Sequence, residues 1–174
     1  MTEESEVIRV SETDPQFKYE LSKNSEIENL MLCMQCGTCT ADCPVARFSS
    51  TYRPLKILRM ALLGMRSSVL SANELWLCAS CYTCTDRCPR GVEFASVLRA
   101  LRNRAVEEGR VPDAFREMSL NILGTGYAYE ISESRLKRRE ELGLPPLPKS
   151  NPEMLSKLAE LAEFKLVKKE GGGK

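Results

Sequence analysis

Eight cysteines in two identically spaced quartets are the residues of this chain best suited to chemistry. The first quartet is Cys33, Cys36, Cys39 and Cys43, followed by Pro44, and the second is Cys78, Cys81, Cys84 and Cys88, followed by Pro89. This C-x2-C-x2-C-x3-C-P run is a ligand pattern of [4Fe–4S] clusters. Three thiolates on one tight loop can bind three irons of the same cluster. The two runs therefore predict two [4Fe–4S] clusters and single-electron transfer.

The fourth cysteine of each run predicts a crossed arrangement of ligands. In two-cluster ferredoxins, the cysteine before the proline ligates the other cluster. The expected ligands are Cys33, Cys36, Cys39 and Cys88 for the first cluster, and Cys78, Cys81, Cys84 and Cys43 for the second. Such crossing would tie the two halves together and bring the clusters close enough for electrons to pass between them. No residue is predicted to be catalytic.

Other uses of these cysteines fit the spacing less well. Disulfide frameworks are typical of secreted chains, whereas this chain starts with acidic residues and has no apolar signal sequence after Met1. Structural zinc usually takes two C-x2-C pairs per ion. A plant-type [2Fe–2S] site needs C-x4-C-x2-C spacing, and a Rieske centre needs histidine, which is absent here. The pattern therefore favours [4Fe–4S] clusters.

The similarity between the two runs extends to their neighbours. An offset of forty-five residues superposes Leu30 on Leu75, Leu32 on Leu77, Thr38 on Thr83 and Thr40 on Thr85. Each run also follows a capping-box pattern, Ser25-x-x-Glu28 and Ser71-x-x-Glu74, which favours the start of a helix. The sequence therefore predicts an internal duplication in which a short helix leads into each cysteine loop.

The segments between and after the runs have helical periodicity. Residues 53–64 read R-P-L-K-I-L-R-M-A-L-L-G, in which Pro54 suits the first helical turn and the leucines repeat at helical spacing. Residues 92–110 likewise place Leu98 and Leu101 on one face. Neither segment shows the alternation of a strand. We therefore predict an all-α fold that carries the two cysteine loops.

Differences in composition predict three parts of the chain. We expect a polar N-terminal arm over residues 1–24, a cluster domain over 25–110, and a helical extension for subunit contacts over 111–174. Within the arm, Phe17, Tyr19 and Leu21 alternate as in a short strand. Within the extension, Asn151 and Pro152 form a typical helix start.

Charge and hydropathy limit the classes of partner. The net charge is +1, so the chain lacks the basic excess that would indicate nucleic-acid binding. No run of eighteen apolar residues occurs, so we expect no transmembrane helix and a cytoplasmic location. Five arginines lie near the ligands in sequence, namely Arg47, Arg53, Arg59, Arg87 and Arg90. They could offset the negative charge of the clusters, or they could form an ordinary solvated face.

Two such runs joined by a helical segment resemble the α-helical ferredoxin domain, over about residues 25–109. That family includes the iron–sulfur subunits of succinate dehydrogenase and fumarate reductase, those of glycolate oxidase, and the C subunits of heterodisulfide reductase in methanogens. The first two groups carry further cysteine-containing regions, whereas no cysteine follows Cys88 here. The chain is therefore most similar to the C subunits of soluble heterodisulfide reductase.

This resemblance implies a non-catalytic, electron-relay subunit of an oxidoreductase complex. In that family, the C subunit passes electrons from a flavin-containing A subunit to a B subunit, which reduces the heterodisulfide of coenzyme M and coenzyme B in methanogenesis. A hydrogenase or a formate dehydrogenase is expected upstream. The resemblance implies no nucleic-acid or membrane partner.

Two other roles stay open on the sequence alone. The chain could be the iron–sulfur subunit of a glycolate- or succinate-oxidising flavoprotein, or a free ferredoxin that diffuses between partners. Diffusing ferredoxins are commonly short and strongly acidic, whereas this chain is nearly neutral and extends from residue 111 to 174 beyond the predicted cluster domain. These features favour a fixed subunit.

Overall fold

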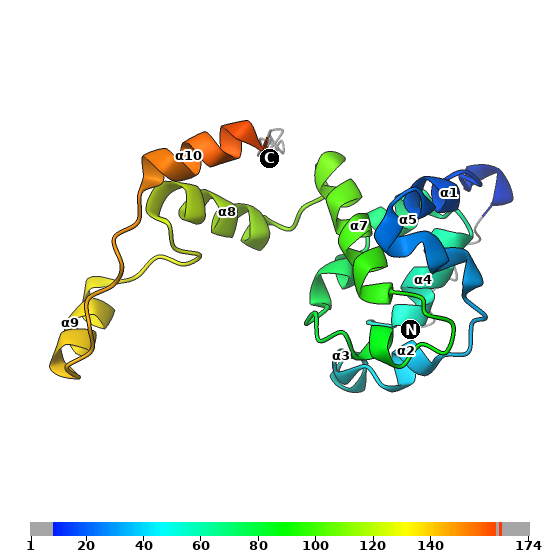
Figure 1. The fold of residues 1–174 in the computed structure, drawn as a ribbon, viewed down its shortest axis with the longest axis horizontal. Helices are drawn as coiled ribbons and strands as arrows, with labels where there is room; N and C mark the ends of the chain where they lie inside the picture. Colours follow the sequence, from blue (N-terminus) through cyan, green and yellow to red (C-terminus); the bar gives the residue numbers. More distant parts are fainter. Residues whose placement is uncertain (1–8, 163, 165–174) are drawn as a thin grey trace, which may run out of the picture. The chain divides into compact units, whose positions relative to one another are not determined.

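Helices form every regular element that the structure describes. The computed structural model describes residues 9–162 and 164, and it divides the chain into two compact units, Met1–Arg110 and Val111–Lys174 (Figure 1). The α-helices of the first unit are α1 (Phe17–Ser22), α2 (Thr38–Ala41), α3 (Pro44–Phe48), α4 (Pro54–Leu62), α5 (Arg66–Leu70), α6 (Thr83–Asp86) and α7 (Phe94–Glu107). Three 3-10 helices accompany them, η1 (Val10–Glu12), η2 (Ser25–Leu32) and η3 (Asn73–Leu77). No strand occurs in the described part of the chain, so the predicted all-α fold is confirmed.

A short helix leads into each cysteine loop, but the predicted capping boxes are wrong. The side chain of Asn24, not of Ser25, accepts a hydrogen bond from the backbone N–H of Glu26 at the start of η2, at 3.0 Å. No side chain caps η3, which begins after Ala72. Both elements are 3-10 helices, whose tighter turns satisfy the terminal backbone groups locally.

The predicted strand at Phe17 to Leu21 is also wrong, because this segment is helix α1. Phe17 and Leu21 are buried, whereas Tyr19 is half-exposed. Residues four apart share one face of a helix. The two apolar side chains therefore reach the core together, and this part of the expected polar arm packs against η2 and α4.

The core lies where α4 and α7 meet the shorter helices. As predicted, α4 begins at Pro54, and Leu98 and Leu101 are buried on one face of α7. Gly64 ends the turn after α4 with a φ of +73°, and its carbonyl accepts a hydrogen bond from the Asp14 N–H at 2.7 Å. A Cβ at Gly64 would lie 2.1 Å from the Asp14 oxygen, so only glycine fits there.

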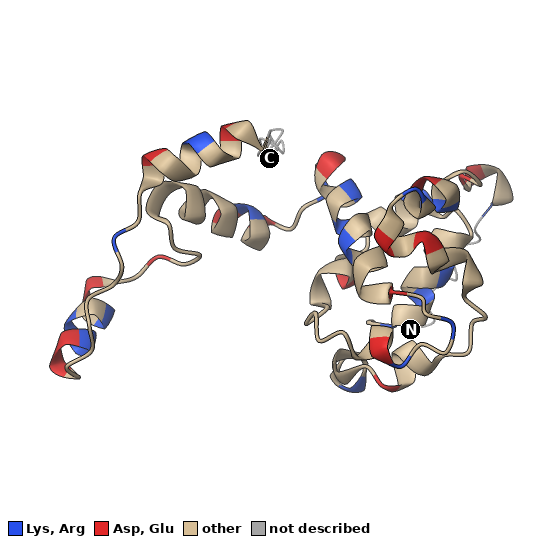
Figure 2. Ribbon diagram, viewed as in Figure 1, with Lys and Arg blue, Asp and Glu red and all other residues tan. Residues whose placement is uncertain are grey.

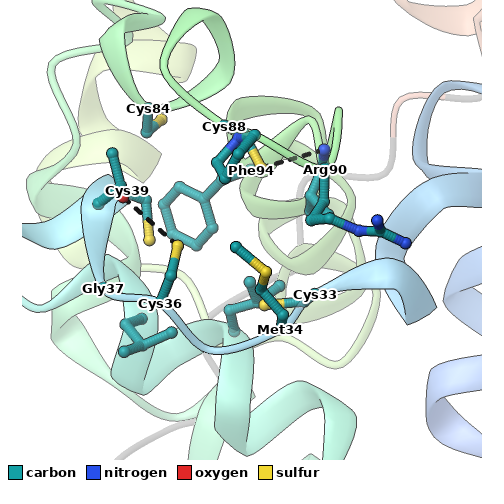
Figure 3. A pocket seen from close by; sticks show the side chains of 14 residues that line it. Cys33, Met34, Cys36, Gly37, Cys39, Cys84, Cys88, Arg90 and Phe94 are labelled. Carbon is teal, nitrogen blue, oxygen red and sulfur yellow. Dashed lines mark hydrogen bonds between the residues drawn. The ribbon is translucent and has the colours of Figure 1, made fainter.

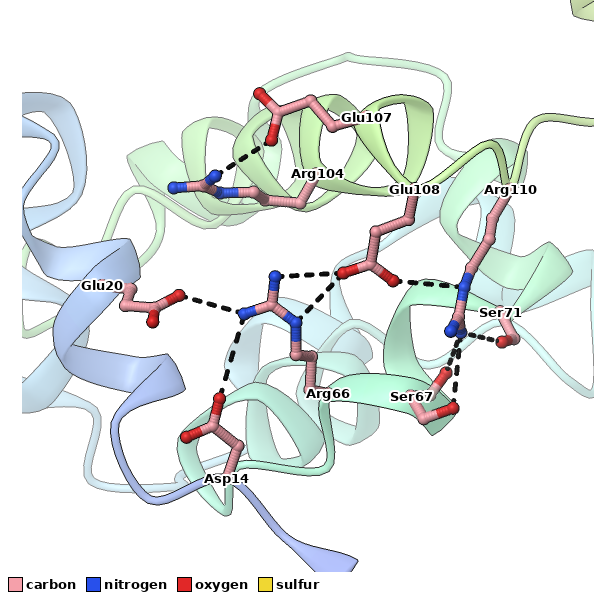
Figure 4. A network of polar contacts seen from close by, with 9 residues as sticks. All are labelled: Asp14, Glu20, Arg66, Ser67, Ser71, Arg104, Glu107, Glu108 and Arg110. Carbon is pink, nitrogen blue, oxygen red and sulfur yellow. Dashed lines mark hydrogen bonds and ion pairs between the residues drawn. The ribbon is translucent and has the colours of Figure 1, made fainter. Parts of the chain in front are cut away.

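An ion-pair network around Arg66 joins segments that are distant in sequence (Figure 4). The Arg66 guanidinium nitrogens lie 3.0 Å from a carboxylate oxygen of Glu20 in α1 and 3.0 Å from one of Glu108, at the end of α7. It also lies over the ring of Phe17, 5.1 Å from the centroid. These partly exposed contacts fix α5 between the first and last helices of the unit.

The second unit contains α8 (Asp113–Thr125), α9 (Glu133–Glu141) and α10 (Pro152–Leu161). The helix predicted at Asn151 and Pro152 is present, with the Asn151 side chain accepting from the Met154 N–H at 3.1 Å. Helices α8 and α10 pack against each other, and α9 carries basic and acidic side chains along its length (Figure 2). None of the residues described in this unit is buried.

Candidate metal centre

The two cysteine loops follow the same backbone path. Each begins directly after a 3-10 helix, at Cys33 and at Cys78. Left-handed backbone then occurs at matching positions, with φ of +60° at Gln35 and +52° at Ser80, and of +85° at Gly37 and +60° at Tyr82. Helices α2 and α6 follow directly. The internal repeat of the sequence is therefore also a repeat of structure.

Amide N–H groups of the protein donate hydrogen bonds to several of the cysteine sulfur atoms. Cys33 Sγ accepts from Gln35 Nε2, Cys78 Sγ from the Ser80 N–H, and Cys88 Sγ from the Val92 N–H, each at 3.3 Å. Donors to sulfur stabilise negative charge on the ligands and on the cluster that they bind, so such contacts tune reduction potential.

Threonines beside each loop and burial within it shift the thiol pKa values in opposite directions. Hydrogen bonds with Thr38 lower the pKa of Cys36, and hydrogen bonds with Thr83 lower the pKa of Cys81. Burial raises the pKa of Cys39 to about 11. The exposed cysteine of each loop is thus the one whose thiolate is favoured, and the thiolate is the form that binds metal.

A cavity brings cysteines from both runs together (Figure 3). Its walls include Cys33, Cys36, Cys39, Cys84 and Cys88, and apolar side chains from α4 and α7 complete it. The three cysteines of the first run therefore face the same space as Cys88 of the second, which is the ligand set expected for the first cluster. Cys84, which is expected to bind the second cluster, borders this cavity too.

The cysteines expected for the second cluster lie around a buried tyrosine. Burial is the main cause that raises the pKa of Tyr52 above its usual range, and the nearby Cys78, Cys43 and Cys84 raise this pKa further. Cys84 is similarly influenced by Cys78 and Cys81. Cys43, which comes from the first run, is buried and lies near the same tyrosine as Cys78 and Cys84 of the second run.

Helices α2 and α6 hold the two cysteine groups against each other. Cys39 lies within α2 and Cys84 within α6, and each of these helices follows its loop directly. The Cys84 thiol is near enough to Cys39 to raise its pKa further, although burial is the larger cause. The structure therefore places the two groups side by side, as a pair of adjacent redox centres requires.

The donor chemistry of both groups fits iron–sulfur clusters. Cysteine thiolates are the ligands of [4Fe–4S] clusters, and sulfur is the donor gathered at both places. Within residues 9–162 and 164, no three side chains of His, Cys, Asp or Glu converge on a position suited to a single metal ion.

Two arginines near the loops, Arg53 and Arg102, donate to backbone carbonyls. Of the arginines noted in the sequence, Arg90 lines the cavity, whereas Arg53 donates to carbonyl oxygens of its own loop. Arg102 of α7 was not singled out from the sequence, because nothing distinguishes it from the other arginines of that helix. It donates to the carbonyls of Leu75 and Cys78, at 2.7 and 3.3 Å, and braces the start of the second loop.

Comparison with known proteins identifies the family. A family model described as a 4Fe–4S dicluster domain matches residues 29–92. The iron–sulfur C subunit of CoB–CoM heterodisulfide reductase from Methanopyrus kandleri is 37% identical over 171 residues, which cover 91% of this chain and 88% of the relative. This chain belongs to the family of heterodisulfide reductase C subunits.

Further members of this family are similar over most of the chain. The C subunit of a ferredoxin:CoB–CoM heterodisulfide reductase from Methanosarcina mazei is 41% identical over 136 residues, covering 76% of this chain and 83% of the relative. The C subunit of an H2:CoB–CoM heterodisulfide, ferredoxin reductase from Methanothermobacter thermautotrophicus is 32% identical over 168 residues, covering 97% of this chain and 89% of the relative. Every helix in the described residues is too short or too polar to cross a bilayer.

Proposed function

We propose that this chain is the electron-relay subunit of a soluble heterodisulfide reductase complex in methanogenesis. It would accept single electrons from a flavin- and iron–sulfur-containing A-type subunit and deliver them to a B-type subunit, which reduces the heterodisulfide of coenzyme M and coenzyme B. The names of its relatives, which are C subunits of such reductases, support the reaction.

The observation that carries this proposal is the contact between the two cysteine groups through α2 and α6. Two bound [4Fe–4S] clusters would supply single-electron chemistry at adjacent positions. We assign the crossed ligand sets to them, with Cys33, Cys36, Cys39 and Cys88 in the first and Cys78, Cys81, Cys84 and Cys43 in the second. The chain's own part is to fix the two sets relative to each other and to exclude water with the buried faces of α4 and α7.

A non-catalytic role follows from the use of the thiols. Cleavage of a disulfide takes two electrons, and a thiol-based site would need cysteines of its own. All eight cysteines of this chain are assigned as cluster ligands. Disulfide reduction is therefore placed in the B-type partner.

The second unit supports a fixed rather than a diffusing subunit. No residue described in it is buried, and several apolar side chains are exposed, among them Leu120, Leu142, Met154 and Leu158. Apolar surface of this kind is typical of subunit contacts. The relatives' names include hydrogen as the donor in one and hydrogen or formate in another, so we assign a hydrogenase or formate dehydrogenase class upstream. Thiolate ligation favours the reducing cytoplasm.

Purification of the native complex through an affinity tag on this chain tests the proposal. Mass spectrometry should identify A-type and B-type heterodisulfide reductase subunits as stoichiometric partners. The isolated chain should accept electrons from a strong reductant but should not reduce the heterodisulfide, and adding the B-type partner should restore turnover with an artificial donor. Reduction by the isolated chain, or stable binding to a succinate- or glycolate-oxidising flavoprotein instead, would contradict it.

A further inference from the structure

The two loops bring a hydrogen-bond donor to their first cysteine in different ways. In the first loop the donor is a side-chain amide, and Gln35 Nε2 lies 3.3 Å from Cys33 Sγ. In the second loop the backbone N–H of Ser80 donates to Cys78 Sγ, also at 3.3 Å. Gln35 and Ser80 are forty-five residues apart and occupy the same place in the repeat. A substitution can therefore remove the first donor, whereas the second belongs to the main chain.

The backbone of the first loop sets the position of Gln35. Its φ is +60°, and that of Ser80 is +52°. A residue with a side chain rarely adopts this left-handed conformation, and where it does the surrounding structure often holds it for a functional reason. The conformation at Gln35 turns the chain back, so that its side-chain amide reaches the sulfur two residues earlier.

The contact between Gln35 and Cys33 lies at the surface. Gln35 is exposed, and Cys33 is partly buried. An exposed hydrogen bond competes with water, so its net contribution is modest. An exposed glutamine also adds little to core packing, so its substitution should leave the fold intact. The effect of the amide on the sulfur can therefore be measured separately from folding.

We propose that Gln35 is a positioning residue of the first cluster, whose side-chain amide donates to the Cys33 sulfur and raises the reduction potential of that cluster. A donor to a thiolate ligand stabilises the more negative, reduced state. This inference rests on the two clusters assigned under the proposed function. It does not depend on the crossed ligands, because Cys33 belongs to the first cluster whichever cysteine is the fourth ligand.

The repeat provides an internal comparison for this role. The side chain of Ser80 does not carry the donor of the second loop, since the main chain supplies it. Removal of the side-chain polar group at the two equivalent positions should therefore have unequal effects. Substitution at position 35 should move the first potential, and Ser80→Ala should leave the second where it is.

The test is a redox titration of the full chain, followed by electron paramagnetic resonance, in the Gln35→Met variant. Methionine keeps the length of the side chain and removes the donor. The midpoint potential of the first cluster should fall, with an about threefold lower reduced-to-oxidised ratio, which is ~28 mV for a one-electron couple. The affected signal should be the one that Cys36→Ser abolishes. In the control, Gln16→Met removes the other glutamine of the chain, which is also exposed, and should move neither potential.

A second variant, Gln35→Glu, keeps the shape of the side chain and puts a carboxylate in place of the amide. The donor is lost and a negative charge is added, so the same potential should fall further, by about tenfold in the ratio or ~59 mV. A purely structural role for Gln35 would lower the iron content of the first cluster without moving the midpoint of the clusters that remain. That result, equal shifts of both potentials, or unchanged potentials with full iron content would overturn the proposal for Gln35. Iron for fewer than two clusters in the unsubstituted chain would instead overturn the cluster assignment beneath it.

Discussion

The two cysteine loops share a backbone path but differ in the residues that support it. Both have left-handed backbone at two matching positions, yet the second of these is Gly37 in the first loop and Tyr82 in the second. Glycine adopts a positive φ freely, whereas for an L-residue with a side chain this conformation costs about 1–2 kcal/mol. The repeat has therefore kept its geometry while accepting strain at this second position in one copy only.

The surroundings of the two loops diverge further. Arg102 braces the start of the second loop, and the position forty-five residues earlier is Ile57, which is buried in α4 and cannot do the same for the first loop. Phe94 borders the first cysteine group, whereas Tyr52 borders the second. Identical ligand spacing therefore leads to two inequivalent sites, and substitutions that act on one loop alone can measure the difference.

The largest expected effect is the loss of one cluster on substitution of a fourth cysteine. The unsubstituted chain should contain about eight irons, and Cys88→Ser or Cys43→Ser should leave about four. If ligation is crossed, Cys88→Ser should abolish the same paramagnetic signal as Cys36→Ser. Cys43→Ser should abolish the same signal as Cys81→Ser.

The crossed assignment would be wrong if Cys88→Ser abolished the same signal as Cys81→Ser, and Cys43→Ser the same signal as Cys36→Ser. Cys36→Ser and Cys81→Ser serve as references, because these two cysteines belong to different loops and are both exposed. Iron and sulfide analysis accompanies each spectrum, so that partial assembly is not mistaken for a change of ligand.

A smaller effect is expected from Arg102→Met. Loss of the charge-assisted bonds to the Leu75 and Cys78 carbonyls should cost about 1.5 kcal/mol. Release of the second cluster to an iron chelator should then be about tenfold faster, while release of the first is unchanged. Absorbance and paramagnetic resonance during anaerobic chelation measure both rates.

Arg66→Met is the matched control for this experiment. Arg66 also makes several polar contacts, but with Asp14, Glu20 and Glu108 rather than with a cysteine loop (Figure 4). Substitution of Arg66 should lower the free energy of unfolding, but it should change the release rates of the first and second clusters by the same factor. Equal acceleration of both clusters in Arg102→Met would show that the brace is not specific to the second loop.

The sequence predicted the repeat, the helices and the candidate ligands, but not the residues that distinguish the two copies. Cysteine spacing and leucine periodicity are local signals, so α4, α7 and the loops could be placed from them. Tyr52 is buried near Cys78, which is distant in sequence, and no local pattern indicates this position. The strand prediction failed because Phe17 and Leu21 fit both periods, and packing against η2 selected the helix.

Gly37→Ala should destabilise the first loop by about 1 kcal/mol, because a Cβ is strained at a φ of +85°. There is room for the added carbon, since its nearest neighbour would be Leu55 Cδ2 at 4.0 Å. The thermal midpoint should fall by roughly 4 °C. In the control, Gly124→Ala, φ is not positive and nothing lies within 4 Å, so no decrease is expected. An unchanged midpoint for Gly37→Ala would mean that the loop relaxes without cost.

The smallest effect concerns Tyr82, which is 46% exposed and interacts with Arg99. Tyr82→Gly should relieve the backbone strain but lose that interaction and gain chain entropy in the unfolded state, so its stability should change little. Tyr82→Ala loses the ring and keeps the strain, and it should therefore be less stable than Tyr82→Gly by about 1 kcal/mol. Thermal unfolding of the two variants under anaerobic conditions gives this difference directly. Because both lack the ring, the comparison isolates the backbone, and an alanine variant as stable as the glycine variant would show that the second loop carries no strain at this position.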